Sequence, residues 1–141
     1  MKTQRFNYLY SCILLGVLVV GMLTSCGKKE TDASVYVKGL SDMAAQYNKN
    51  CPKDQPNGTV LESVTFADST MTFRLSLSDK AIETVNLEDA RDSIIHNMSD
   101  NLKKFLVKGN CNIEYKYVSP NDSSSITIIP NELGYTESEE K

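Results

Sequence analysis

The sequence predicts an α+β fold, a two-layer sandwich in which two helices cover one face of a four-stranded antiparallel sheet, in the order αββαββ. Two patterns carry this prediction. Apolar and polar residues alternate over residues 59–78 and 111–129, as in strands with one covered face and one wet face. Apolar residues recur at steps of three and four over residues 33–49 and 86–108, as in amphipathic helices.

The first predicted helix extends from about Ala33 to Lys49. Its apolar stripe consists of Val37, Leu40, Met43, Ala44 and Tyr47. The stretch NKNCPKDQPNG then ends the helix, because it contains two prolines and an Asn-Gly pair.

The next stretch, TVLESVTFADSTMTFRLSLS, predicts a β-hairpin with its turn at ADST. In its second limb the apolar residues Met71, Phe73, Leu75 and Leu77 alternate with Thr72, Arg74, Ser76 and Ser78. In the first limb we expect Val64 and Phe66 on the covered side, because they continue the same alternation.

The second predicted helix covers residues 86–108. Asn86 can cap its start, and acidic residues in the first turns favour the positive end of the helix dipole. Lysines lie near its end, and Gly109 can take the left-handed position that follows a helix. Its stripe consists of Leu87, Ile94, Met98, Leu102 and Phe105.

The segments CNIEYKYV and SSITIIP predict a second hairpin around SPND, closed by Pro130. One face would carry Cys111, Ile113, Tyr115 and Tyr117, matched by Ile126 and Ile128 on the partner strand. Tyr115 and Tyr117 can line a ligand pocket, but their strand spacing beside Ile113 favours a place in the core.

The N-terminus has the features of an export signal. Lys2 and Arg5 make it positive, no acidic residue precedes Glu30, and Cys12–Met22 is a run of 11 apolar or glycine residues. A membrane-spanning helix needs about 20 apolar residues, so a permanent transmembrane anchor is disfavoured.

Directly after this run, Leu23-Thr24-Ser25-Cys26 resembles the lipobox of bacterial lipoproteins, an aliphatic residue and two small residues before a modified cysteine. The resemblance covers residues 1–26 and implies that Cys26 becomes a lipidated N-terminus. Several acyl chains hold a protein firmly on a membrane, whereas one holds it marginally. By resemblance to lipoprotein sorting in Gram-negative bacteria, Gly27 favours the outer membrane, with the domain facing the periplasm. Ordinary secretion with a chance cysteine is the alternative.

These features predict four segments: a signal peptide over residues 1–25, a lipidated cysteine and tether over 26–33, a single α+β domain over 34–135, and an acidic disordered tail over 136–141. Without residues 1–25, which carry two of the 15 basic residues, 13 basic residues face 18 acidic ones, a net charge of −5. This acidic balance argues against nucleic-acid binding, which needs a clustered basic face.

Cys51 and Cys111 remain beside the lipidated cysteine. An oxidising compartment favours a disulfide between them. In the chain-entropy model, closing the loop between these cysteines would stabilise the folded state by up to about 4 kcal/mol. The alternatives are two buried free thiols or a catalytic cysteine, and no Cys-X-X-Cys motif supports the last.

The sequence predicts no catalytic, cofactor or metal site. His96 is the only histidine, and helical geometry places it opposite Leu87, with Asp92 and Asp100 one turn on either side. These three residues can hold a metal weakly, but the common occurrence of such pairs on exposed helices favours a solvated charged face. A structural zinc site normally needs four cysteine or histidine ligands, and no common catalytic or nucleotide-binding motif is present.

We therefore expect a membrane-anchored envelope lipoprotein that acts as a non-enzymatic binding or accessory module. The polar sheet face, with Arg74, Glu114 and Lys116 beside Asn112 and Thr127, is the expected surface for a protein partner, and plain solvent is the alternative. The second hypothesis is a lipid-anchored inhibitor or immunity protein against an envelope enzyme or toxin. The third is a hydrolase that uses His96.

Overall fold

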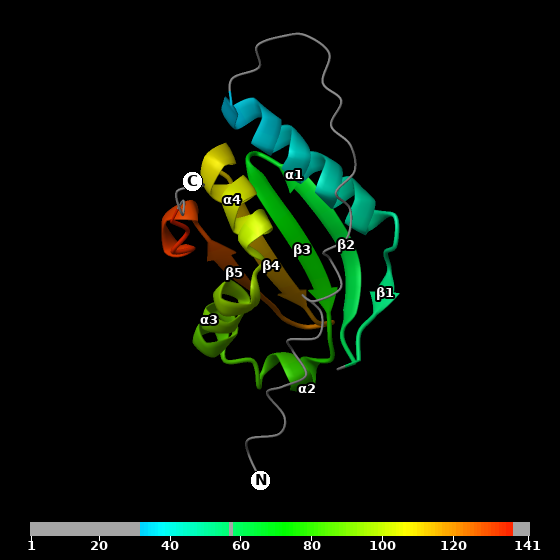
Figure 1. Ribbon diagram of the computed structural model, residues 1–141. Helices are drawn as coiled ribbons and strands as arrows, with labels where there is room; N and C mark the ends of the chain where they lie inside the picture. Colours follow the sequence, from blue (N-terminus) through cyan, green and yellow to red (C-terminus); the bar gives the residue numbers. More distant parts are fainter. Residues whose placement is uncertain (1–31, 57, 137–141) are drawn as a thin grey trace.

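The computed structural model describes residues 32–56 and 58–136. The predicted signal peptide, lipobox and most of the predicted acidic tail lie outside the described residues. Within them, one mixed sheet has helices packed on one of its faces (Figure 1). The α+β class is therefore confirmed, while the number of elements and the strand directions differ from the prediction.

The sheet has five strands in the spatial order β1-β2-β3-β4-β5. Their bounds are β1 Lys53–Asp54, β2 Val60–Ala67, β3 Thr70–Ser76, β4 Asn112–Val118 and β5 Ser123–Ile128. The helices are α1 Asp32–Asn48, α2 Asp79–Ile82, α3 Leu87–Asn97 and α4 Asp100–Gly109, followed by the 3₁₀ turn η2 Pro130–Glu132. β1, α2 and η2 were not predicted from the sequence, and each of them is four residues or shorter.

Both predicted hairpins are confirmed. β2 pairs antiparallel with β3 around a turn in which Asp68 and Ser69 both have positive φ, and β4 pairs antiparallel with β5. Two successive left-handed residues form the type of tight turn that matches the twist of a hairpin.

The prediction of an all-antiparallel sheet was wrong, because β3 and β4 are parallel. The chain between them contains α3 and α4, and α4 runs back beside the sheet to the end where β3 began (Figure 1). A helical connection of this length returns the chain to the same end of the sheet, so the two strands point in the same direction.

The single helix predicted over residues 86–108 is broken at Met98 and Ser99. Asn86 caps α3 as expected, but Met98 is extended, and the Ser99 hydroxyl accepts a hydrogen bond from the Leu102 amide to begin α4. A serine cap starts a new helix because it satisfies an amide that lacks an intrahelical partner.

The left-handed residue after α4 is Asn110, with φ 50°, and not Gly109 as expected. Gly109 is the last residue of the helix and is buried, and a Cβ there would lie 3.4 Å from the Cβ of Tyr36 on α1. The glycine therefore serves the close approach of the two helices, and asparagine takes the strained backbone position.

The core lies between the helices and the sheet. Its fully buried members include Leu40 on α1, Met71 on β3, Leu106 on α4, Ile113 on β4 and Ile128 on β5. Tyr115 and Tyr117 belong to this core as predicted, since they are 7% and 4% exposed. The Tyr115 ring stacks on Phe73 with a centroid separation of 5.0 Å.

Candidate binding surface on the open face of the sheet

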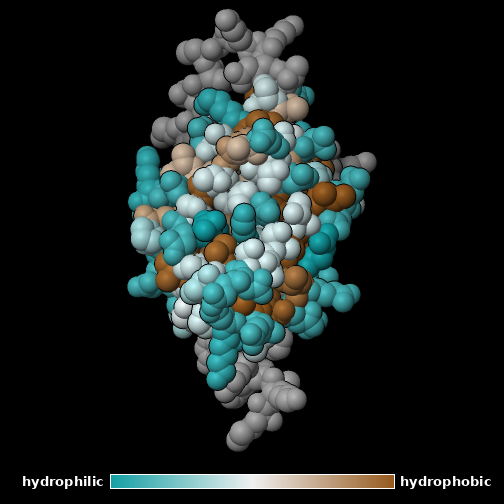
Figure 2. Space-filling view, turned by 180° about the vertical axis from the view of Figure 1, so that it is seen from behind, coloured by the Kyte–Doolittle hydropathy of each residue, from teal (hydrophilic) through white to brown (hydrophobic). Residues whose placement is uncertain are grey.

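The sheet face opposite the helices is polar and accessible. Its side chains are those that alternate with the core residues: Ser63, Thr65, Thr72, Arg74, Ser76, Asn112, Glu114, Lys116, Ser125 and Thr127. We call this set, together with Val60 and Val118 at one end, the open face. Figure 2 shows the molecule from behind, with hydrophilic and intermediate residues over most of the surface and hydrophobic residues in separate patches. The polar residues predicted for this face lie on it.

Two cations lie side by side at the centre of the open face. Arg74 on β3 is the register partner of Lys116 on β4, and the same row continues to Ser63 on β2 and Ser125 on β5. Neighbouring strands are about 4.8 Å apart, so both charges occupy one small area of the surface.

Glu114 on the open face and Glu62, which lies beside this face on β2, form hydrogen bonds with hydroxyl groups. The Glu114 carboxylate accepts a hydrogen bond from the Thr72 hydroxyl at 3.2 Å, and Glu62 accepts one from Ser76 at 2.6 Å. Within the described part of the chain, no ion pair joins Arg74 or Lys116 to an acid. Their N–H donors therefore face solvent and are available to an anionic group of a partner.

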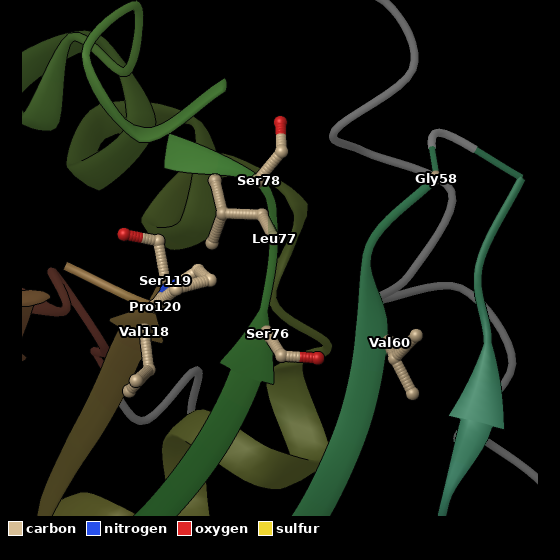
Figure 3. Close-up of a pocket in the computed structure, with 8 residues that line it drawn as sticks. All are labelled: Gly58, Val60, Ser76, Leu77, Ser78, Val118, Ser119 and Pro120. Carbon is tan, nitrogen blue, oxygen red and sulfur yellow. The ribbon is translucent and has the colours of Figure 1, made fainter. Parts of the chain in front are cut away.

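The open face ends in a shallow groove of about 490 Å³. It is lined by Gly58, Val60, Ser76, Leu77, Ser78, Val118, Ser119 and Pro120 (Figure 3). Val60 extends from β2, and Leu77, Val118 and Pro120 lie across from it around the ends of β3 and β4. The groove therefore offers apolar side chains and serine hydroxyls about two residues, or roughly 7 Å, along the strands from the cation pair.

One wall of the groove is fixed by a hydrogen-bond network around Asp79 at the start of α2. The Asp79 carboxylate accepts bonds from the Ser119 hydroxyl at 2.6 Å and from the backbone and side-chain amides of Asn121 at 3.0 and 2.6 Å. The bond from Ser119 and those from Asn121 hold the pKa of Asp79 below its usual value, because they stabilise the charged form. The network ties the loop after β3 to the β4–β5 turn.

The predicted disulfide is not present, since Cys51 and Cys111 are both free thiols. The Cys51 thiol lies near the carbonyl of Tyr47 at the end of α1, whereas Cys111 packs below Gly109, next to Tyr36. Tyr36 and Tyr47 are 11 residues apart on one helix, which separates the two sites by about 16 Å. A disulfide needs Cα atoms within about 7 Å, so this arrangement does not allow the bridge.

Burial raises the pKa of both thiols above its ordinary value. A raised pKa leaves less of the reactive thiolate at neutral pH, and neither cysteine lies on the open face. Cys111 is fully buried and Cys51 is half-buried, which matches the alternative of two structural thiols.

His96 is exposed on α3, as expected, and Asp92 is exposed on the same helix. The break before Ser99 places Asp100 on α4, so the predicted spacing of Asp92, His96 and Asp100 does not form one helical face. Among residues 32–56 and 58–136, no three histidine, cysteine or acidic side chains gather in a way that could hold a metal ion.

The groove was not predicted, and Val118 was the one clue to it, as an apolar residue at a position that the strand alternation assigns to the wet face. Val60 gave no such clue, because it is in phase with Val64 and Phe66, and only the register irregularity between Leu61 and Ser63 brings it to the open face. The Asp79 network was missed as well, because its partners are 40 and 42 residues apart in sequence.

Comparison with known proteins finds similarity at the level of fold. No family model and no curated protein matches the chain. A crystal structure named as that of a "putative secreted protein" from Pseudomonas aeruginosa is similar, with a TM-score of 0.63 and 12% sequence identity. The match covers 75% of this chain and 99% of that chain, so the likeness extends over nearly the whole of the Pseudomonas protein. In the described segments, no helix combines the length and apolar character needed to cross a bilayer.

Proposed function

We propose that this protein is a lipid-anchored protein of the bacterial cell envelope, and that its domain is a non-enzymatic binding module whose open face contacts a partner protein. Lipidation at Cys26 would hold the domain on the membrane, facing the periplasm from the outer membrane. The five residues between Cys26 and the start of α1 at Asp32 can span at most about 18 Å, which would keep the domain close to the lipid surface.

The observation that carries the binding role is the position of Arg74 beside Lys116, at the centre of a polar face that no helix covers. Neither cation forms an ion pair with an acid of the described residues. Two like charges side by side repel each other and so do not stabilise the isolated domain. Such a pair gains favourable interactions when a partner supplies carboxylates or other acceptors.

Two further observations support an envelope location. The first 26 residues have the charge, apolar run and lipobox of a lipoprotein signal. The structurally similar Pseudomonas aeruginosa protein is named a "putative secreted protein", which agrees with export of this chain.

The binding role is tested by crosslinked pull-down of the lipidated protein from intact membranes. We expect a partner that is captured by the native chain and lost from the Arg74→Glu, Lys116→Glu double variant. The matched control is the Lys38→Glu, Lys49→Glu double variant, which changes the net charge by the same amount. Lys38 lies on α1 and Lys49 directly follows it, so both substitutions are on the helix side of the sheet.

Equal capture by both double variants would contradict a role for the open face. The identity of the captured protein separates an accessory module from an inhibitor, since an inhibitor would co-purify with an envelope enzyme or toxin and lower its rate.

The anchor is tested separately by labelling cells with radioactive palmitate. We expect the native protein to carry the label and Cys26→Ala to lack it. Unlabelled native protein released into the culture fluid would contradict lipid anchoring.

A further inference from the structure

The outer edge of β5 has backbone groups available for pairing. β5 pairs with β4 alone and is the last strand in the order β1-β2-β3-β4-β5. Which of its backbone groups point outward follows from the hydrogen bonds at the β4–β5 turn.

The amide of Ser119 donates to the carbonyl of Asp122 at 2.8 Å, so these two residues form a hydrogen-bonded pair. Such pairs alternate along an antiparallel ladder, which directs the backbone groups of Ser124, Ile126 and Ile128 toward β4. The groups of Ser123, Ser125, Thr127 and Ile129 therefore point away from the sheet. The hydrogen bonds on the other side of β4 show the same alternation. There the Val118 carbonyl accepts a hydrogen bond from the Leu77 amide, and the Asn112 amide donates one to the Ser69 carbonyl.

The two ends of this outward row are occupied, and the middle is open. The Ser123 amide donates to its neighbour's carboxylate, Asp122 Oδ1, at 2.7 Å, and the Ile129 amide donates to Glu132 Oε2 at 2.9 Å. Between them, no described residue accepts from the outward amides of Ser125 and Thr127. Two residues with free N–H and C=O groups can form four hydrogen bonds with one extended strand.

The edge also lacks the usual features that prevent strand addition. Natural edge strands carry inward charges, lysines, prolines or bulges that discourage pairing. The sequence of β5, SSSITI, has no charged residue and no proline, and its pairing with β4 is regular from Ser123 to Ile128. Ile129 follows it with 44% of its surface exposed.

From this geometry we infer that the β5 edge binds an extended segment of a partner protein by strand addition, centred on Ser125 and Thr127. The inference rests on the proposed function, because it names how the partner of the open face is held. Backbone bonds would supply affinity, and side chains on alternate positions of the added strand would supply specificity.

The side chains next to the edge define the chemistry of the added segment. Lys116 is the register partner of Ser125, whose small side chain leaves the lysine room to reach a residue on the added strand. An acidic residue opposite Ser125 would pair with Lys116, and an apolar residue four positions away would cover Ile129. The segment is therefore an extended strand with an acidic and an apolar side chain on its open-face side.

A second copy of this chain fits the edge less well. Stable dimers bury about 800 Å² on each partner, and an edge window of two residues supplies far less. Two mature chains with a net charge of −5 each also repel.

The inference is tested with a phage-displayed library of random heptapeptides, selected on the full mature chain carrying Cys26→Ser. We expect enriched peptides with an acidic residue and an apolar residue four positions apart. For a synthetic peptide of that consensus, Ser125→Pro and Thr127→Pro should each raise the dissociation constant about tenfold or more, because each removes an outward amide. Ser125→Ala and Thr127→Val keep the amide and are the matched controls, for which we expect less than about a twofold change.

N-methylation of each peptide amide in turn gives a second measurement on the unchanged protein, so the test does not depend on the proline variants folding. We expect methylation to weaken binding at every second amide only. No enriched peptide, equal binding by the proline variants, or an N-methyl series without alternation would overturn the inference. A dimer that dissociates on Thr127→Pro would also overturn it, in favour of a second copy.

Failure of this inference can be distinguished from failure of the proposed function. If a partner captured from membranes is lost on Arg74→Glu, Lys116→Glu but retained by both proline variants, the open face binds the partner without strand addition.

Discussion

Replacement of Lys116 by glutamine should leave the isolated domain at least as stable as the native chain. Lys116 lies beside Arg74 in the parallel pairing of β3 and β4 and has no acidic partner among the described residues. For two charges at the strand spacing of about 4.8 Å in water, the repulsion is about 0.9 kcal/mol, and physiological salt reduces it to roughly half. Lys116→Gln should therefore raise the free energy of unfolding by about 0–0.5 kcal/mol.

The assay is urea unfolding of the mature chain carrying Cys26→Ser, at low and at about 1 M salt. We expect any gain in stability to disappear at high salt, where the charges are screened. Arg91→Gln is the comparison, because Arg91 forms an ion pair with Glu132 and its loss should lower stability. A loss of more than about 1 kcal/mol in Lys116→Gln would refute the reasoning, since it would show that this lysine has a structural partner.

Three further predictions concern the core, the groove wall and the thiols. Leu106→Ala should lower the free energy of unfolding by about 2–5 kcal/mol in urea titrations, because Leu106 is fully buried, and a loss below about 1 kcal/mol would contradict the packing. Asp79→Asn should destabilise the domain more at pH 7 than at pH 3: the folded pKa of Asp79 is lowered, so its contribution is fully present above the ordinary aspartate pKa and is lost as pH falls through the folded value. An equal effect at both pH values would contradict that assignment. Mass spectrometry after alkylation should find Cys51 modified in the folded protein and Cys111 only after unfolding, whereas two cysteines that resist alkylation in urea until reductant is added would indicate a disulfide.

Local patterns in the sequence were sufficient to predict the paired strands and the first helix. Strict alternation over Met71, Phe73 and Leu75 places these residues on the covered face, and the apolar stripe around Leu40 places α1 over them. Each of these features depends on residues a few positions apart, so periodicity reports them directly.

The direction of β4 relative to β3 and the break between α3 and α4 could not be predicted from those local patterns. The parallel pairing of β3 and β4 depends on where a 35-residue connection, residues 77–111, returns the chain, and periodicity within a strand does not report it. The helix break was not predicted because Met98, where it occurs, is apolar and falls at an expected position of the apolar stripe. The capping residue Ser99 was the one local indication of the break.

The candidate site was predicted in part for the same reason. Alternation assigns Arg74, Glu114 and Lys116 to the polar face, and the structure places them there. That Arg74 and Lys116 are neighbours follows from the pairing of β3 with β4, which joins residues 42 positions apart, so their juxtaposition could not be read from either strand alone.

The proposed binding role requires that the open face is the surface that contacts a partner in the envelope. The direct measurement is photo-crosslinking in living cells, with benzoylphenylalanine placed at Thr72 on the open face or at exposed Ala45 on α1. We expect Thr72 to yield a discrete crosslinked protein that is lost in the Arg74→Glu, Lys116→Glu background, and Ala45 to yield none. Crosslinks from Ala45 with none from Thr72 would place the partner on the helix side and contradict the account.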